Sequence, residues 1–232
     1  MRTISFDGTF ETWISEARIL LAEKIHYDQV IWQKNIGNRF TGTFFDGLSI
    51  PPKFKNVVTL IPRELLLEAE FVSCFNDFST WRLLYKIFYR TLFEDINLLH
   101  SKNDFDLIEF NRRKLEVSDE LQNLKATTQF QEIKENDESI YMGRYRSHHR
   151  ILKFSAAFFT NCFEGMNWVV LTPEQTMARV LGQYQFGPGF SEMIELRCFI
   201  ESLFNSPKKD LNMLFNDEAC SKQNSNSSEN HL

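Results

Sequence analysis

The sequence predicts an α+β fold in which a mostly helical single domain carries a small mixed sheet and a β-hairpin. Several long stretches repeat their apolar residues at helical spacing, and several short ones alternate or cluster them as strands do. These segments follow one another without a regular strand–helix–strand order, which favours α+β over α/β. We expect the domain to span residues 1–205 and residues 206–232 to form a polar, disordered tail. The 23 Phe favour a core rich in aromatic rings.

The N-terminal part predicts a strand, a helix and a second strand. Thr3–Phe6 alternates its apolar side chains and ends at an Asp-Gly turn. Thr9–Leu21 has helical spacing, with a threonine in the capping position. Gln29–Trp32 resembles a second short strand. The glycines and paired prolines of Asn35–Lys55 predict a long loop.

Three helices are predicted in the middle of the chain. The β-branched run Val57–Ile61 precedes Pro62, which suits the first turn of a helix that continues to about Phe75. A second helix buries the face from Trp81 to Leu92. A third, long helix covers Asp104 to about Thr128.

The next part predicts the hairpin. Phe130–Ile133 and Ile140–Arg146 flank a polar turn and form its two strands. Ile151–Cys162 returns to helical spacing, so Cys162 is expected to be a buried, inert thiol. Trp168–Leu171 is a compact apolar strand.

A capping signature follows this strand. In Thr172-Pro173-Glu174-Gln175 the threonine is in the N-cap position of a helix and the proline in the first helical position. The glutamine side chain, three residues after the cap, can bond back to the backbone of the N-cap residue. We therefore predict a helix that ends at Gly182. Phe186-Gly187-Pro188-Gly189 is interpreted as a rigid turn. A last helix is predicted at Phe190–Asn205, stopped by Pro207.

Charge and composition limit the partners and the compartment. The net charge of −5 gives no global attraction for nucleic acid, so a nucleic-acid role needs a local basic patch. Four scattered cysteines without a C-x-x-C pair indicate reduced thiols. Without an apolar leader or a run of about 20 apolar residues, we expect a soluble, cytoplasmic protein with no membrane contact.

The common cofactor and nucleophile motifs are absent from the sequence. It contains no G-x-x-x-x-G-K-[ST] phosphate loop, no G-x-G-x-x-G, no H-E-x-x-H and no G-x-S-x-G. These absences exclude several large enzyme classes without excluding catalysis. We predict no cofactor.

The densest positive charge lies in Tyr141–Lys153, which contains no acidic residue. Arginines interleaved with Tyr141 and Tyr145 could follow a phosphate backbone and stack a base. The alternative is a solvated hairpin face, balanced by the acids of its turn. A second cationic feature, Arg82, Lys86 and Arg90, is either the wet face of its helix or an anion contact.

Adjacent histidines lie within the basic segment. In an extended chain His148 and His149 point to opposite faces, so both cannot easily bind one metal ion, and we predict no metal site. A single histidine, His149, is the candidate for a general acid or a phosphate contact.

Many short landmarks between Ile4 and Gly189 resemble, in the same order, a bacterial family known mainly as a domain of unknown function and labelled a DNA metabolism or DNA repair protein. They are Phe6-Asp7-Gly8-Thr9-Phe10-Glu11, Trp13, Ala17-Arg18, Leu20-Leu21, Val30, Trp32, Leu84-Tyr85, Arg90, Lys125-Ala126, Phe130, His149, Ile151-Leu152, Ala156, Phe158-Phe159, Phe163, Trp168, Leu171-Thr172-Pro173 and Phe186-Gly187-Pro188-Gly189. Members of the family occur alone, associated with a radical-SAM DNA modification or repair protein, or fused ahead of a uracil-DNA glycosylase-like domain.

The chain departs from the family pattern at two places. Thr127 and Gln129 replace an aromatic residue and an arginine, and Arg146-Ser147-His148 replaces an acid-x-Pro-like approach to His149. The resemblance is therefore to a divergent member, in which we do not expect a family site that uses these groups.

Three functions follow from these observations. The first is a DNA repair or DNA modification accessory that binds DNA or a damaged base through the basic hairpin. The second is an interaction module for a radical-SAM or glycosylase-like repair partner, and the third is an enzyme acting on nucleic acid with His149 as acid or base. The residues predicted to bind nucleic acid are Arg90, Arg144, Tyr145, Arg146, His149, Arg150 and Lys153.

Overall fold

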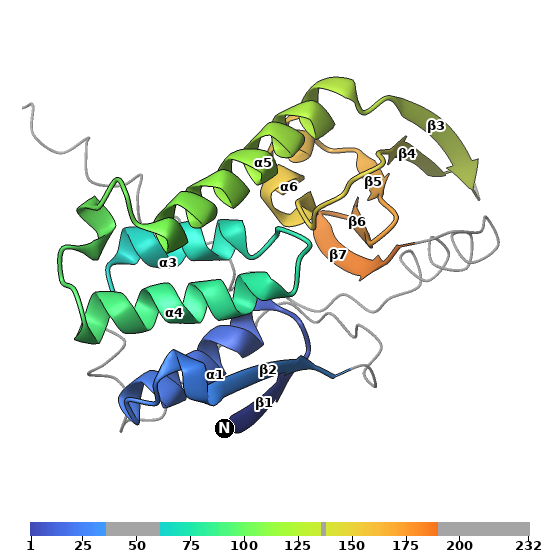
Figure 1. Cartoon of the computed structure of the whole chain (residues 1–232). Coiled ribbons are helices and arrows are strands. Elements are labelled where there is room, and N and C mark those ends of the chain that lie inside the picture. Colours follow the sequence, from blue (N-terminus) through green and yellow to red (C-terminus); the bar gives the residue numbers. More distant parts are fainter. Residues whose placement is uncertain (36–60, 136–137, 190–232) are drawn as a thin grey trace, which may run out of the picture.

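The computed structural model describes residues 1–35, 61–135 and 138–189 and gives the predicted α+β class (Figure 1). The described residues contain five α-helices, two short 3-10 helices and two sheets. In chain order the elements are β1 (Arg2–Phe6), α1 (Phe10–Ala22), η1 (Tyr27–Gln29), β2 (Val30–Lys34), α3 (Arg63–Val72), α4 (Ser79–Phe93), η3 (Leu98–His100), α5 (Phe105–Thr127), β3 (Phe130–Glu135), β4 (Glu138–Arg144), α6 (Leu152–Cys162), β5 (Asn167–Leu171), β6 (Gln175–Val180) and β7 (Gln183–Pro188).

Both sheets contain a parallel pair joined by a helix. β1 and β2 run parallel, with Ile4 opposite Trp32, and α1 connects them. The second sheet has the order β3-β4-β5-β6-β7, in which only the central pair β4–β5 is parallel, so it is mixed. Because parallel strands need a crossover, the chain leaves the sheet after β4, forms α6 and returns in β5.

The helices separate the two sheets (Figure 1). α3 and α4 lie between the β1–β2 unit and the long α5, and α5 extends over to α6 and the five-stranded sheet. Asp104 caps α5 by accepting hydrogen bonds from the backbone N–H groups of Asp106 and Leu107, at 3.0 and 3.2 Å. None of the described helices is long and apolar enough to cross a membrane.

Aromatic rings occupy the centre of the helical part, as the composition predicts. Trp13 is fully buried, and its ring lies 5.6 to 5.7 Å from the rings of Phe10, Trp32, Trp81 and Phe88. A second cluster, centred on Trp168, joins α5 and α6 to one face of the five-stranded sheet. A third cluster covers the other face of that sheet.

Most predicted elements are confirmed with shifted ends. The helix predicted from Pro62 begins after it and stops at Val72, and the strand predicted at Gln29–Trp32 is β2, preceded by η1. The helices predicted around Trp81 and after Asp104 are α4 and α5. Three predicted segments lie outside the described residues: the part of the long loop that follows Asn35, the final helix and the polar tail.

The helix predicted after Thr172 is wrong, because this segment is strand β6. The Thr172 hydroxyl donates to the Gln175 carbonyl and accepts from its N–H, at 2.8 and 3.1 Å, which closes a turn between β5 and β6. The capping signature is local, whereas strand pairing on both sides decides the conformation. Gly182 does not close a helix: with Leu181 it forms a two-residue hairpin loop with positive φ at both positions.

Two further sequence interpretations are corrected. Phe186–Pro188 belongs to β7, an edge strand where proline is tolerated, and is not a rigid turn. Cys162 is exposed at the end of α6 and is not a buried thiol. Of the two cysteines that the structure describes, Cys74 is buried, and burial raises the pKa of its thiol to about 12.

The packing around Trp13 gives a direct stability test. Trp13→Ala removes the ring from the centre of the aromatic cluster, and we expect it to lower the free energy of unfolding by about 3–5 kcal/mol, measured by urea titration. Phe105→Ala is the control, because that side chain is 87% exposed, and we expect a change within about 0.5 kcal/mol. Equal losses in both variants would contradict this description of the core.

Candidate functional site

The basic segment is only partly a hairpin. β3 and β4 pair antiparallel as predicted, but β4 ends at Arg144. The residues that follow form the β4–α6 loop (Tyr145–Ile151), and Lys153 lies in the first turn of α6. The prediction of a strand continuing to Arg146 is therefore wrong, because the crossover to β5 takes the chain away from the sheet at this point.

The carboxylate of Glu120, in the middle of α5, holds the β4–α6 loop in place. Its Oε1 accepts a hydrogen bond from the backbone N–H of His148 at 2.6 Å and a longer one from that of His149 at 3.3 Å. The hydroxyl of Ser147 lies 2.5 Å from the same oxygen. Because the Glu120 side chain is only 11% exposed, these bonds are largely shielded from water and fix the course of the loop.

The two histidines differ in exposure, but both rings approach the carboxylate of Glu120, with Nδ1 of His148 lying 3.9 Å from its Oε2. The side chain of His148 is 82% exposed and that of His149 only 12%. Nδ1 of His149 accepts a hydrogen bond from the Asn76 N–H at 3.3 Å, and Nε2 lies 3.7 Å from Oε2 of Glu120. Both ring nitrogens of His149 therefore face protein groups.

The surroundings of His149 favour its neutral form. Its ring packs on Phe75, with centroids 4.6 Å apart. Burial lowers the pKa of His149 and outweighs the opposing effect of Glu120 and Glu116. Within the part of the chain that the structure describes, no group of three or more His, Cys, Asp and Glu side chains is placed to hold a metal ion.

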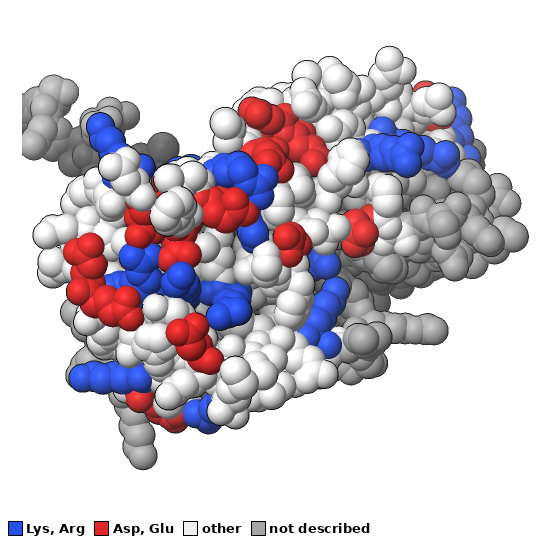
Figure 2. Space-filling view, viewed as in Figure 1, with Lys and Arg blue, Asp and Glu red and all other residues white. Residues whose placement is uncertain are grey.

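Arg144 and Arg146 are exposed on either side of Tyr145. Tyr145 is half-buried against the core around Trp168, and its N–H donates to the Leu171 carbonyl at 3.0 Å. Burial, followed by the charge of Glu120, raises the pKa of Tyr145. Figure 2 shows Lys and Arg side chains gathered over β3 and β4, whereas over the helices they alternate with carboxylates.

Arg150 and Lys153 turn inward, toward the N-terminal part of the chain. A guanidinium nitrogen of Arg150 donates to the Gly8 carbonyl at 3.3 Å. Nζ of Lys153 lies 2.9 Å from Glu11 and 2.5 Å from Glu70. Burial opposes the charge of Lys153, but hydrogen bonds to these two carboxylates outweigh it and raise its pKa. Lys153 therefore joins α6 to α1 and α3.

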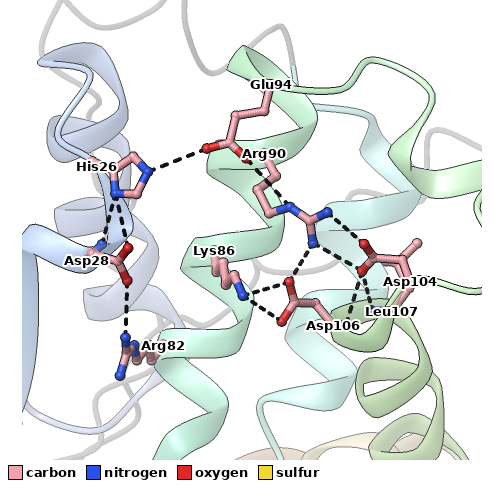
Figure 3. A network of polar contacts seen from close by, with 9 residues as sticks. All are labelled: His26, Asp28, Arg82, Lys86, Arg90, Glu94, Asp104, Asp106 and Leu107. Carbon is pink, nitrogen blue, oxygen red and sulfur yellow. Dashed lines mark hydrogen bonds and ion pairs between the residues drawn. The ribbon is translucent and has the colours of Figure 1, made fainter.

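The cationic stripe of α4 is paired with carboxylates along its length (Figure 3). Arg82 lies 3.2 Å from Asp28, and Lys86 lies 2.9 Å from Asp106.

Arg90 is the most heavily paired residue of this stripe. It binds Asp104 at 2.6 Å and Asp106 at 2.5 Å, with Glu94 at 3.6 Å (Figure 3). The hydrogen bond to Asp104 and the attraction of both aspartates outweigh burial and raise the pKa of Arg90. Its partners lie on α4 and at the start of α5, so the structure does not bring Arg90 together with the β4–α6 loop.

The sequence interpretation missed Glu120. It lies on a helix whose polar residues resemble an ordinary solvated face, and its partners lie 27 to 29 positions further along the chain. No local pattern marks such a residue. Only the pairing of α5 with the loop after β4 reveals its role.

The described residues define an α+β protein with a mixed five-stranded sheet and a fixed basic loop after its second strand. Residues 79–227 match a family described as "Domain of unknown function (DUF4130)", and the chain belongs to this family. The match begins at the first residue of α4, so it includes the landmarks from Leu84 to Gly189 and leaves out those from Phe6 to Trp32. No match was found among curated proteins or solved structures.

The pairing of Arg90 gives a second stability test. Arg90→Met leaves Asp104 and Asp106 without their guanidinium partner, and we expect a loss of about 1–3 kcal/mol in the free energy of unfolding. Arg82→Met is the matched control on the same helix, because its pair with Asp28 is largely exposed, and we expect a change within about 0.5 kcal/mol. Similar losses of unfolding free energy in both variants would argue against a stabilising role for the Arg90 ion pairs.

The neutral state of His149 predicts a pH effect on stability. Its folded pKa lies below the ordinary 6.5, so the unfolded chain binds the proton first as the pH falls. The stability due to neutral His149 is full above about pH 6.5 and decreases as the pH falls toward the lowered folded pKa. We expect His149→Gln to flatten the change in unfolding free energy between about pH 7.5 and 5.5, measured by urea titration. An unchanged slope would show that His149 is not buried neutral.

Proposed function

We propose that this chain binds DNA as an accessory of DNA repair or DNA modification, through a surface formed by Arg144, Arg146 and His148. The observation that carries the proposal is that these three side chains, at the end of β4 and in the loop after it, are exposed, although Nδ1 of His148 lies 3.9 Å from Glu120. Arg90, Arg150 and Lys153 are less exposed: Arg90 and Lys153 pair with carboxylates, and Arg150 donates to a carbonyl.

The chemistry of this surface suits a phosphate backbone. A guanidinium group binds phosphate oxygens through two parallel N–H donors, and exposed cations release counterions from DNA when they bind. Glu120 holds the loop that carries Arg146 and His148, so little conformational freedom is lost on binding. The chain as a whole carries a charge of −5, and binding therefore depends on this local patch.

The resemblance to bacterial DNA metabolism and repair proteins supports the same proposal. It also implies a radical-SAM or uracil-DNA glycosylase-like partner. That partner, the stacking of a base on Tyr145 and an acid–base role for His149 stay predictions. Since Tyr145 is half-buried and both nitrogens of His149 face protein groups, these two roles require part of the loop to move.

A salt series tests the DNA-binding surface. We expect fluorescence anisotropy with a labelled duplex to show Kd rising steeply with NaCl, and Arg144→Gln with Arg146→Gln to weaken binding. Loss of two phosphate contacts makes the slope of log Kd against log [NaCl] shallower by about 1.8.

The matched control is Arg82→Gln with Arg112→Gln, which removes the same charge from carboxylate-paired sites and should leave the slope unchanged. Absence of salt-dependent binding by the unmodified chain, or equal losses in both double variants, would refute the proposal.

A further inference from the structure

A second cationic site lies at the carboxyl ends of β1 and β2. The two strands run parallel with Phe6 opposite Lys34, so both end at the same edge of their sheet. β1 leads through Asp7 and Gly8 to Thr9, which caps α1. In open sheets the region outside the carboxyl ends of parallel strands is where ligands bind, because loops and a helix N-terminus meet there.

Two cationic side chains from distant parts of the sequence converge on Gly8. Arg150, from the β4–α6 loop, donates to the Gly8 carbonyl at 3.3 Å. The side chain of Lys34 lies over Gly8, where an added Cβ would be 2.8 Å from its Cε. Gly8 also has φ of +90°, a conformation that L side chains rarely adopt. Glycine at this position therefore leaves room for the Lys34 side chain beside the strand end.

Three of the acids around these cations already have donors of their own. Asp7 accepts hydrogen bonds from the N–H and hydroxyl of Thr9, at 2.8 and 2.7 Å, and from the Thr12 hydroxyl. Glu11 and Glu70 bind Lys153.

Lys34 and Arg150 form no ion pair with the carboxylates of residues 1–35, 61–135 and 138–189, unlike Lys153. Burial, followed by the charge of Arg150, lowers the pKa of Lys34. The charges of Glu174 and Asp7 act in the opposite direction but do not outweigh these effects. Both side chains reach Gly8, so the two like charges lie near each other, and a bound anion would reduce their repulsion.

We infer that Lys34 and Arg150 form a phosphate-binding site at the carboxyl ends of β1 and β2. The inference rests on the proposed function and extends it, because Arg150 belongs to the same loop as Arg146 and His148. Lys34 supplies a point charge and Arg150 a planar fork, the two donors that bind phosphate oxygens in proteins. The phosphate belongs either to a nucleic-acid backbone or to a free nucleotide or phosphate ion.

Lys34→Gln and Arg150→Gln test the site on the full chain. Lys24→Gln is the matched control: Lys24 is an exposed lysine beyond the opposite end of α1. Each variant is measured by anisotropy with a labelled single strand in a salt series, and by calorimetric titration with inorganic phosphate. Thermal unfolding checks that each variant folds. Because the Lys34 side chain is exposed, we expect Lys34→Gln to fold, so it still tests the site if Arg150→Gln fails to fold.

The outcomes separate the two proposals. We expect Lys34→Gln and Arg150→Gln each to make the salt slope shallower by about 0.7 for a single strand, with Lys24→Gln unchanged. If the unmodified chain binds no DNA, the proposed function fails. In that case, a heat of phosphate binding that is lost in Lys34→Gln supports a site for free phosphate. If DNA binding depends on Arg144 and Arg146 but both tested variants match the unmodified chain, and no phosphate heat appears, the inference is overturned while the proposed function stands.

Discussion

The structure depends on cations that pair with carboxylates from other elements. Arg90 of α4 binds Asp104 and Asp106 at the start of α5, and Lys153 of α6 binds Glu11 of α1 and Glu70 of α3. These pairs lie at the edges of the aromatic core and fix how the helices meet. Because partly buried charges are costly without partners, each pair favours one arrangement of its helices.

Glu120 extends this principle to the backbone. It accepts hydrogen bonds from loop N–H groups in place of a cationic side chain, so a carboxylate of α5 determines the path from β4 to α6. As a result His149 packs inward on Phe75, while the side chains of His148 and Arg146 are exposed to solvent. The loop after β4 thus separates an inner, structural side from an outer, charged side.

Periodicity predicted the helices well, because α4 and α5 carry long apolar stripes and α5 has an aspartate cap. The failure at Thr172 has a physical cause: a four-residue signature fits both a helix start and a tight turn, and neighbouring strands select the turn. The sequence located the cationic side chains but did not show which carboxylates pair with them. The partners of Arg90 lie 14 and 16 positions away, and those of Lys153 lie 142 and 83 away. Lys34 was missed for the same reason, since only the parallel register of β1 and β2 places it beside Gly8.

We propose a division among the cations: those of α4 stabilise the fold, whereas the exposed Arg144 and Arg146 bind DNA. Amide hydrogen exchange of the full chain with and without duplex DNA tests it most directly, because it locates contacts without altering a side chain. We expect DNA to slow exchange in the segment from Arg144 to Ile151 and to leave α4 around Arg82, Lys86 and Arg90 unaffected. Protection centred on α4, with none after β4, would contradict the claim.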